Sequence, residues 1–361
     1  MKQMEFASLF TRYEWCWEMS KENISNKIFI VAELSANHGH DIQVAKESIL
    51  AAKEAGADAI KLQTYTADTL TIDCNNEYFT LNSGTIWDGT TLYELYKQAS
   101  TPWEWHEELF NYAKQIEIKC FSTPFDNSSV DFLERFNPPL YKVASFELLD
   151  IPLIKYIASK NRPIIMSTGI AMIDEVDDAI SACKEVGNDD ITLLKCTSSY
   201  PTELSDSNLL DITFLKERYN VNVGLSDHTL GNTAAQVAVG LGARVFEKHF
   251  ILDKSIGGPD SSFSVDKNEL KEYVKAIRDA ESALGVIGED FNNEKKSGRQ
   301  FARSLFVVED ISKGDVFTSE NIRSIRPGNG IPPKFIDKII GSKTNKDIKR
   351  GTPLNWDMIS S

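Results

Sequence analysis

The sequence has few cysteines and no long apolar run. Its five cysteines are spread over 361 residues without a C-x-x-C pair, which argues against a disulfide framework or a thiolate metal cluster. No apolar run approaches the ~20 residues of a membrane span. Glu5, Arg12 and Glu14 interrupt the N-terminal residues, which therefore lack the apolar stretch of a signal peptide. We expect a reduced, cytoplasmic protein with no membrane association.

Basic residues are also scarce. Lys and Arg total 39 against 53 Asp and Glu, so the formal net charge is -14 with neutral histidines, and no Lys/Arg-rich run stands out. A protein that binds a nucleic-acid backbone needs a positive surface. We therefore expect no nucleic-acid partner, and any anionic ligand must be met by cations placed locally.

After residue 26, short apolar or β-branched runs alternate with helical patterns. Within 44–55 and 175–186 the apolar residues recur at three- and four-residue spacing, as in an amphipathic helix. This alternation is typical of parallel βαβ units. Eight strands with eight following helices predict an α/β fold of the closed (β/α)8 TIM-barrel type. The expected strands are 27–32, 59–64, 119–122, 140–145, 163–168, 191–196, 221–226 and 244–249.

The rival fold is an open doubly wound sheet. That fold usually carries a glycine-rich phosphate turn after its first strand. Here the turn at 33–38 reads Glu-Leu-Ser-Ala-Asn-His. The closed barrel is therefore the favoured prediction.

The composition changes after the last predicted barrel helix, at about 266–283. Glycines and a serine mark a linker, and turn pairs and a Pro/Gly cluster at 326–333 then indicate a small β-rich domain. The predicted organisation is a lead segment 1–26, a barrel 27–284, a linker 285–300 and a C-terminal domain 301–361.

Polar residues follow nearly every predicted strand at its carboxyl end. In a (β/α)8 barrel the chemistry lies at that end. The apolar runs that begin the strands make the polar ends more conspicuous. In strand order the candidates are Glu33 and Asn37, Lys61 and Gln63, Ser122 and Thr123, Lys142, Ser145 and Glu147, Ser167 and Thr168, Lys195, Thr197 and Tyr200, Ser226, Asp227 and His228, and Glu247 and His249.

Two histidines occupy matched positions on the seventh and eighth strands. Period-2 alternation places Ser226 with His228 on one strand face, and Glu247 with His249 on another. If both faces point inward, two neutral imidazoles lie at the same height and suit a divalent ion, with Glu247 or Asp227 orienting them. Each histidine could instead be a structural residue.

A cluster of hydroxyls and one long cation is suited to binding a phosphate. Hydrogen bonds from short hydroxyls and the point charge of a lysine are the usual means of holding that group. The alternative is that the hydroxyls cap the helices that follow. The cluster consists of Thr123, Lys142, Ser145, Ser167 and Ser226.

Lys195, at the end of the sixth strand, has a separate interpretation. A lysine in such a position can form the Schiff base of a pyruvate aldolase. It could equally be ion-paired or face the surface. A sugar-binding barrel without catalysis also remains open, although it would not explain why His228, His249 and Lys142 occur together.

The strand-end segments resemble the sialic acid synthase family, which condenses phosphoenolpyruvate with an acylated amino sugar. The resemblance extends from residue 27 to 357, and the terminal domain is similar to the antifreeze-like (SAF) domain of that family. The resemblance implies a homodimer in which that domain lies over the partner's barrel. Nine short segments in order carry it: AE (32–33), NH (37–38), ADAIKLQT (57–64), STPF (122–125), YK (141–142), STG (167–169), GLSDHT (224–229), EKHF (247–250) and RPGNG (326–330).

Four segments resemble the pseudaminic acid synthase branch within that family: ELSANH (33–38), TLYELY (91–96), ASFE (144–147) and LKCTS (194–198). An N-acetylneuraminate synthase would usually show Cys-Thr-Asn at 196–198 and a Gly-Ser-Gly-Glu-like run at 144–147, where this chain has Cys-Thr-Ser and Ala-Ser-Phe-Glu. The implied sugar is 2,4-diacetamido-2,4,6-trideoxy-L-altrose. An N-acetylneuraminate or legionaminate synthase with the same mechanism is the alternative.

The resemblance also implies roles for individual residues. His228 and His249 would bind a divalent metal, Mn²⁺, Mg²⁺ or Co²⁺. Glu147, which follows the fourth strand beside Lys142, is our own candidate for proton transfer. Glu33 could instead orient the sugar or the water, and Lys61 is a third candidate catalytic residue. Phosphoenolpyruvate would contact Thr123, Lys142, Ser145, Ser167, Thr197 and Ser226, and the sugar would contact Glu33, Lys61, Gln63, Tyr200, Asp260 and Arg326.

Overall fold

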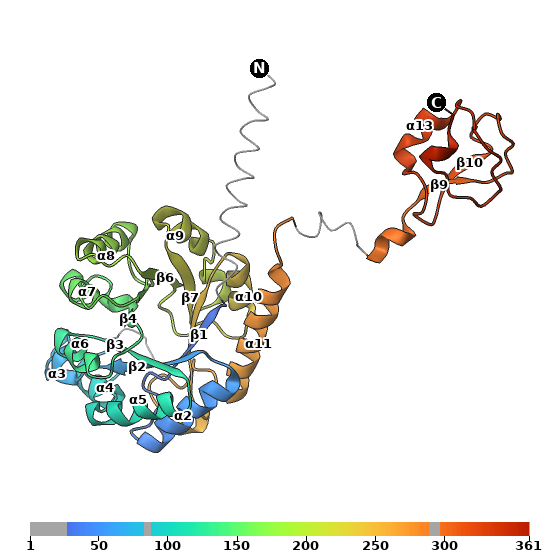
Figure 1. Cartoon of the computed structure of the whole chain (residues 1–361). Helices are drawn as coiled ribbons and strands as arrows, with labels where there is room; N and C mark the ends of the chain where they lie inside the picture. Colours follow the sequence, from blue (N-terminus) through green and yellow to red (C-terminus); the bar gives the residue numbers. More distant parts are fainter. Residues whose placement is uncertain (1–26, 83–87, 289–296, 361) are drawn as a thin grey trace. The chain divides into compact units, whose positions relative to one another are not determined.

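Eight parallel strands form one sheet in the order β3-β2-β1-β8-β7-β6-β5-β4. The two ends of this order, β3 and β4, contact each other, so the sheet closes into a barrel (Figure 1). The (β/α)8 prediction is confirmed, and the open doubly wound sheet is excluded. The strands are β1 Phe29–Glu33, β2 Ala59–Thr64, β3 Lys119–Pro124, β4 Tyr141–Val143, β5 Ile164–Ser167, β6 Ile191–Cys196, β7 Asn222–Asp227 and β8 Val245–His249.

The computed structural model describes residues 27–82, 88–288 and 297–360. The predicted lead segment 1–26 and residues 289–296 of the predicted linker lie outside that range. The chain divides into two compact units, Met1–Gly285 and Val286–Ser361. No helix in the described ranges is long and apolar enough to cross a membrane.

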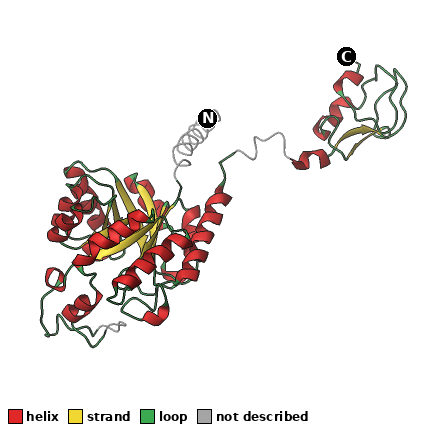
Figure 2. Cartoon of the chain, turned by 60° about the horizontal axis from the view of Figure 1, so that its bottom comes forward, coloured by secondary structure: helices red, strands yellow, loops and turns green. Residues whose placement is uncertain are grey.

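A helix follows each strand and packs on the outside of the barrel (Figure 2). Asp41, Asp126, Asp150 and Asp266 cap four of these helices, because each carboxylate accepts a backbone N–H of the first turn. Two further helices, α3 Ala67–Leu70 and α4 Leu92–Ala99, are inserted between β2 and its barrel helix. The barrel helices are α2 Ile42–Ala55, α5 His106–Gln115, α6 Asn127–Glu134, α7 Ile151–Ala158, α8 Ile173–Glu185, α9 Asp211–Tyr219, α10 Thr233–Gly240 and α11 Lys267–Leu284.

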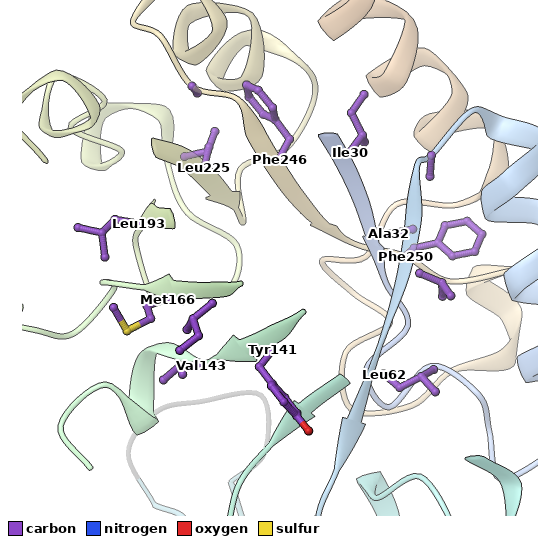
Figure 3. Close-up of a cluster of buried hydrophobic side chains, with 14 of the residues drawn as sticks. Ile30, Ala32, Leu62, Tyr141, Val143, Met166, Leu193, Leu225, Phe246 and Phe250 are labelled. Carbon is purple, nitrogen blue, oxygen red and sulfur yellow. The ribbon is translucent and has the colours of Figure 1, made fainter. Parts of the chain in front are cut away.

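Side chains alternate between the two faces of the barrel wall. Outward-facing residues such as Ile30, Met166 and Phe246 form the layer between strands and helices (Figure 3). An inner layer fills the barrel interior, and the next inward-facing position along each strand is polar or sulfur-containing. The apolar layer is Val31, Ala59, Phe121, Ile165, Leu194 and Val245. The positions that follow it are Glu33, Lys61, Thr123, Lys142, Ser167, Cys196, Ser226 and Glu247.

The fourth strand is shorter than predicted. It ends at Val143 because residues Ser145–Glu147 turn into a 3-10 helix, η2. This turn places Ser145 and Glu147 at the mouth of the barrel. The other strand bounds differ from the predictions by only a few residues.

The second unit contains the antiparallel pair β9 Ser304–Val307 and β10 Ile322–Ile325. Isolated antiparallel bridges, such as Ile311 with Ile348, extend the β structure around an apolar core. A short helix, α13 Ile336–Ile339, contributes to that core. The core residues are Leu305, Val307, Ile311, Phe317, Ile322, Ile331, Ile339, Ile348 and Leu354.

Candidate active site

A cavity of about 460 Å³ lies at the carboxyl ends of the barrel strands. This volume falls within the range of small-molecule sites. The closed sheet brings together predicted site residues that are far apart in the sequence. Those that line the cavity are Glu33, Lys61, Gln63, Lys142, Ser145, Glu147, Ser167, Tyr200, Ser226, His228, Glu247, His249 and Asp260.

Four buried charges form a network across the barrel interior. Lys61 Nζ lies 2.8 Å from Glu33 Oε2 and 3.5 Å from Glu247 Oε2, and Lys142 Nζ lies 3.6 Å from Glu247 Oε1. Glu247 therefore bridges the two lysines. Two cations and two carboxylates balance in formal charge, which is how such groups can remain buried.

The lysines and Glu247 hold one another in their charged forms. Burial opposes the ionisation of Glu247, but Lys142 and Lys61 outweigh it and lower the pKa of that carboxyl. Burial lowers the pKa of Lys142, and Glu247 acts in the opposite direction. Because the Lys142–Glu247 contact is long, Lys142 is the cation that an incoming anion can recruit with least disruption.

Hydroxyl groups and the backbone of Gly169 lie close together in the part of the cavity near Lys142. Ser145 Oγ accepts a hydrogen bond from Gly169 N at 3.1 Å. A Cβ on Gly169 would lie 2.3 Å from Ser198 Oγ and 2.7 Å from Ser145 Oγ, so a larger residue there would have to displace these hydroxyls. Ser167 Oγ is buried and has no hydrogen-bond partner. An unpartnered hydroxyl beside a buried cation suits an anionic group such as phosphate.

The imidazoles of His228 and His249 lie at the same end of the barrel, with ring centroids 5.4 Å apart. His228 Nδ1 is 2.9 Å from the Thr197 carbonyl oxygen, which only accepts, so Nδ1 carries a proton. In the neutral ring Nε2 then carries the lone pair. Burial lowers the pKa of His249 well below its usual range, and its Nδ1 has no hydrogen-bond partner.

This histidine pair fits a divalent ion with open coordination positions. A neutral imidazole with a free lone pair is a ligand for such an ion. Asp260 Oδ2 lies 3.9 Å from His249 Nδ1. No group of three or more His, Cys, Asp or Glu in the described residues could hold a metal. Any ion here would take its other ligands from water and substrate.

Cys196 lies beside His228, with Sγ 3.9 Å from Nδ1. Burial would raise its pKa, but the contacts with His228 and, to a smaller extent, Ser145 and Lys142 lower the pKa of Cys196 to about 7. The same contact raises the pKa of His228 against the effect of burial. We did not predict Cys196 as a site residue, although alternation from Leu194 would have placed it on the inner face.

Glu147 contributes a titratable carboxyl to the cavity. Burial raises its pKa to about 7, although Lys142 opposes the rise. Its Oε2 is buried and has no hydrogen-bond partner. A carboxyl with these properties can both donate and accept a proton near neutral pH. Burial likewise raises the pKa of Glu33 to about 7, against the effect of Lys61.

Several predicted residues lie off the cavity surface. Thr123 is fully buried beneath it and accepts a hydrogen bond from Lys61 Nζ at 3.2 Å. Thr197 does not line the cavity, and its carbonyl instead accepts from His228. Asn37 is buried and donates to the Phe250 carbonyl oxygen. Arg326 is exposed in the second unit.

Two alternative interpretations of strand-end residues are not supported. Lys195 is absent from the cavity lining, and its Nζ donates to the Cys196 carbonyl oxygen at 2.8 Å. Asp227 was expected as a possible partner of the histidines, but it pairs with Lys248 at 3.2 Å. Both residues occupy outward-facing positions, since Cys196 and His228 beside them line the cavity.

Sequence reasoning missed part of the cavity wall. Ser35 accepts a hydrogen bond from Gln63 Nε2 at 2.8 Å and donates to Asp260. Its position two residues after Glu33 was the signal for it. The leucines of 65–99 were also missed, because no strand end marks that segment. They are Leu70, Leu81, Leu92 and Leu95.

Comparisons with known families agree with this architecture. The NeuB family matches residues 48–289, and the SAF domain matches residues 302–360. The predicted start of the terminal domain at residue 301 lies next to this second match.

The chain is also similar to individual proteins over most of its length. It is 51% identical to the pseudaminic acid synthase of Campylobacter jejuni, covering 92% of this chain and 96% of that protein. The pseudaminic acid synthase of Helicobacter pylori is 49% identical, with coverages of 91% and 97%. The N,N'-diacetyllegionaminic acid synthase of Legionella pneumophila is 40% identical, with coverages of 92% and 95%.

Solved structures include a protein with the same fold. The crystal structure of a spore coat polysaccharide biosynthesis protein from Bacillus subtilis aligns with a TM-score of 0.63 at 33% identity. The alignment covers 93% of this chain and 96% of that one.

Proposed function

This chain belongs to the NeuB family, and we propose that it condenses phosphoenolpyruvate with 2,4-diacetamido-2,4,6-trideoxy-L-altrose and water to give pseudaminic acid and phosphate. The observation that carries the proposal is one cavity that combines a phosphate-binding cluster around Lys142 with the His228–His249 pair. An N-acetylneuraminate or legionaminate synthase would use the same chemistry. The higher identity to pseudaminic acid synthases, 51% against 40%, favours the first sugar.

Lys142 and the hydroxyls of Ser145 and Ser167 hold the phosphate end of phosphoenolpyruvate. The methylene carbon of phosphoenolpyruvate then attacks the aldehyde carbon of the open-chain sugar, and the aldehyde oxygen takes up a proton. Water adds at the carbon that bears the phosphate and loses one proton, which leaves a hydroxyl group. That hydroxyl loses its proton as phosphate leaves with its carbon–oxygen bond broken, so that a ketone forms and the phosphate carries the second proton away. The protein must therefore deliver one proton to the aldehyde oxygen and take one from water.

Glu147 is the residue we assign to proton transfer, because its carboxyl titrates near neutral pH and has an unpartnered oxygen. Glu33 is held by Lys61 and by Gln63 Nε2 at 2.9 Å. Those contacts fix its orientation, which suits a group that positions the sugar or the water.

His228 and His249 would hold a divalent ion, Mn²⁺, Mg²⁺ or Co²⁺. When bound, the ion supplies Lewis acidity that polarises the sugar aldehyde. The support is the unpartnered nitrogen of His249 and the lone pair on His228 Nε2. Metal-free protein should bind one Mn²⁺ per chain by calorimetry, and His228→Ala or His249→Ala should abolish both that binding and turnover.

A phosphate-release assay tests the function. The full chain is incubated with phosphoenolpyruvate and a panel of acylated amino sugars, with and without chelator. We expect release only with the diacetamido trideoxy sugar, loss in chelator, and recovery with Mn²⁺, Mg²⁺ or Co²⁺. Preference for N-acetylmannosamine would overturn the sugar assignment, and full activity in excess chelator would overturn the metal assignment.

The same assay distinguishes the proposed synthase from a Schiff-base aldolase. An aldolase using Lys195 would ignore chelators and would be trapped by borohydride with pyruvate. The side chain of Lys195 is engaged with the Cys196 carbonyl oxygen and with Thr197 Oγ1. This geometry favours the synthase.

The protein is proposed to work as a cytoplasmic homodimer in which the SAF domain of one subunit covers the barrel of the other. The four cysteines among the described residues are free thiols, as expected in a reducing compartment. The loops after β4 to β7 expose large apolar side chains at the barrel rim, which a second copy of the chain would cover. These are Phe146, Ile170, Met172, Leu204, Leu210 and Leu230. Arg326 would contact the sugar bound in the partner's barrel.

A further inference from the structure

The segment between β2 and α5 lines the cavity with apolar side chains that the proposed reaction does not use. The inner face of the strands supplies most of the polar lining, whereas this segment supplies all four leucines of the lining. The residues from this segment, which we call the apolar wall, are Tyr65, Leu70, Leu81, Leu92, Leu95, Tyr96 and Ala99.

Helix α4 carries the centre of the apolar wall. The Thr91 side chain caps the helix by accepting the Glu94 N–H. Leu92, Leu95, Tyr96 and Ala99 then recur at the spacing of one helix face, whereas Glu94, Lys97 and Gln98 are exposed. Leu92 and Leu95 are only partly buried, because their face borders the cavity rather than packed protein.

Contacts with neighbouring elements fix α4 against the barrel. The Tyr96 and Tyr65 rings pack edge-on with centroids 5.9 Å apart. The Tyr65 ring also packs edge-on against Phe125, which follows β3, with centroids 5.0 Å apart. His40, in the loop after β1, forms a 2.6 Å hydrogen bond to the Gln98 carbonyl oxygen. The wall is thus a preformed part of the site.

The apolar wall and Glu147 line the same cavity. Burial raises the pKa of Tyr96, and the nearby Glu147 carboxyl raises it further. The proposed proton-transfer group and the wall therefore face the same ligand. We call the polar strand-end residues that line the cavity the polar floor. A sugar whose aldehyde carbon lies at the polar floor would extend the other end of its six-carbon chain toward the wall.

The proposed sugar carries apolar groups that match this wall. It has a methyl group at C6, where most hexoses have a hydroxymethyl group, and each acetamido group ends in a methyl. Burying a methyl against leucine is favourable, because it removes apolar surface from water. A hydroxyl in the same place would lose its hydrogen bonds to water without gaining a partner.

We propose that Leu92 and Leu95 of the apolar wall bind the C6 methyl of the sugar and thereby select 6-deoxy sugars over their 6-hydroxy counterparts. This inference rests on the proposed function and adds the residues that determine its specificity. The residues of the polar floor bind the reacting groups, and the wall selects the substituents at the far end of the sugar.

The test compares two sugars that differ only at C6: 2,4-diacetamido-2,4,6-trideoxy-L-altrose and 2,4-diacetamido-2,4-dideoxy-L-altrose. Phosphate release is measured for wild type, Leu95→Ala and Leu95→Gln. We expect wild type to prefer the 6-deoxy sugar. Leu95→Ala should lose about 10- to 100-fold in kcat/KM for that sugar. Leu95→Gln should also raise the relative use of the 6-hydroxy sugar. KM for phosphoenolpyruvate should stay within about 2-fold in both.

Ile72→Ala is the matched control. Ile72 lies in the same segment, is 59% exposed and does not line the cavity, so its variant should retain wild-type kinetics. Thermal unfolding of each variant shows whether the barrel is intact. If a folded Leu95→Gln variant has the wild-type ratio of kcat/KM for the two sugars, the role of the wall is overturned but the proposed function is not. Failure of wild type to turn over the 6-deoxy sugar would overturn the proposed function, and the inference with it.

Discussion

Lys142 is the buried cation whose charge is most available to a ligand. Its Nζ lies 3.6 Å from Glu247 and donates to the Val143 carbonyl oxygen at 3.2 Å. Hydrogen bonds to charged groups contribute roughly 1.5 to 3 kcal/mol each. Lys142→Ala should therefore weaken the use of phosphoenolpyruvate by at least ~10-fold in kcat/KM, with a much smaller change in KM for the sugar.

Lys195→Ala is the control for this variant, because it removes a nearby strand-end lysine that faces away from the cavity. It should retain the wild-type response to phosphoenolpyruvate in the same steady-state assay. Wild-type kinetics in Lys142→Ala, or a selective loss in Lys195→Ala, would contradict the assignment.

Glu147 should make the ligand-free protein less stable as the pH rises. Burial raises the pKa of this carboxyl from 4.5 to about 7 in the folded protein, so ionising it costs more there than in the unfolded chain. The stability of wild type relative to Glu147→Gln therefore falls between these two pH values. Above pH 7 the variant should be more stable by at most about 3 kcal/mol.

Urea unfolding of both proteins at pH 4.5, 6 and 8 measures this difference. The change of this stability difference with pH reports ionisation alone, because any packing change in the variant alters the free energy of unfolding by the same amount at each pH. A stability difference that does not change between pH 4.5 and pH 8 would contradict the raised pKa.

At the scale of elements, β7 and β8 are joined on both faces. Asp227 pairs in register with Lys248, and Ser226 with Glu247. On the outer face Lys248 Nζ lies 3.2 Å from Asp227 Oδ2 and donates to the Thr229 carbonyl oxygen. A fixed register on these strands also fixes the spacing of His228, which follows β7, and His249, which ends β8.

Removing one member of this buried ion pair should be costly. Lys248→Met leaves Asp227 buried without its cation, and the free energy of unfolding should fall by about 3 to 5 kcal/mol. Lys254→Met is the control, because the Lys254–Glu269 pair is half-exposed at 45% and 48% and should contribute at most ~1 kcal/mol. Denaturant unfolding measures both variants, and equal losses would show that burial of the pair is unimportant.

At the scale of the whole molecule, the proposed dimer predicts complementation between two inactive subunits. Arg326 is exposed and precedes a Pro-Gly turn, and its planar donors suit an acetamido carbonyl or a sugar hydroxyl. Arg326→Ala homodimers and His228→Ala homodimers should each lose activity. After subunit exchange, their heterodimer contains one barrel with intact histidines covered by an intact arginine, so partial activity should return.

Subunit exchange is verified by mass spectrometry of differently tagged chains. Exchange without recovery would defeat the arrangement in trans, because an arginine acting on its own barrel leaves no intact site in the heterodimer. Unchanged sugar kinetics in Arg326→Ala would defeat the role of this arginine.

The sequence by itself determined the order of the elements and the polar ends of the strands. Both follow from local rules: helix and strand periodicities are read within a few residues, and a closed barrel brings all carboxyl strand ends to one rim. The matched positions of His228 and His249 followed from the same alternation.

Only the tertiary structure decided which strand-end residues share the cavity and what completes its wall. Cys196 faces inward while Lys195 beside it faces outward, and His228 lines the cavity while Asp227 pairs behind it with Lys248. The bridging role of Glu247 depends on two lysines from distant strands. The leucines of α4 lie on a helix that follows no strand directly, so their place in the cavity wall results from long-range packing, which local periodicity does not encode.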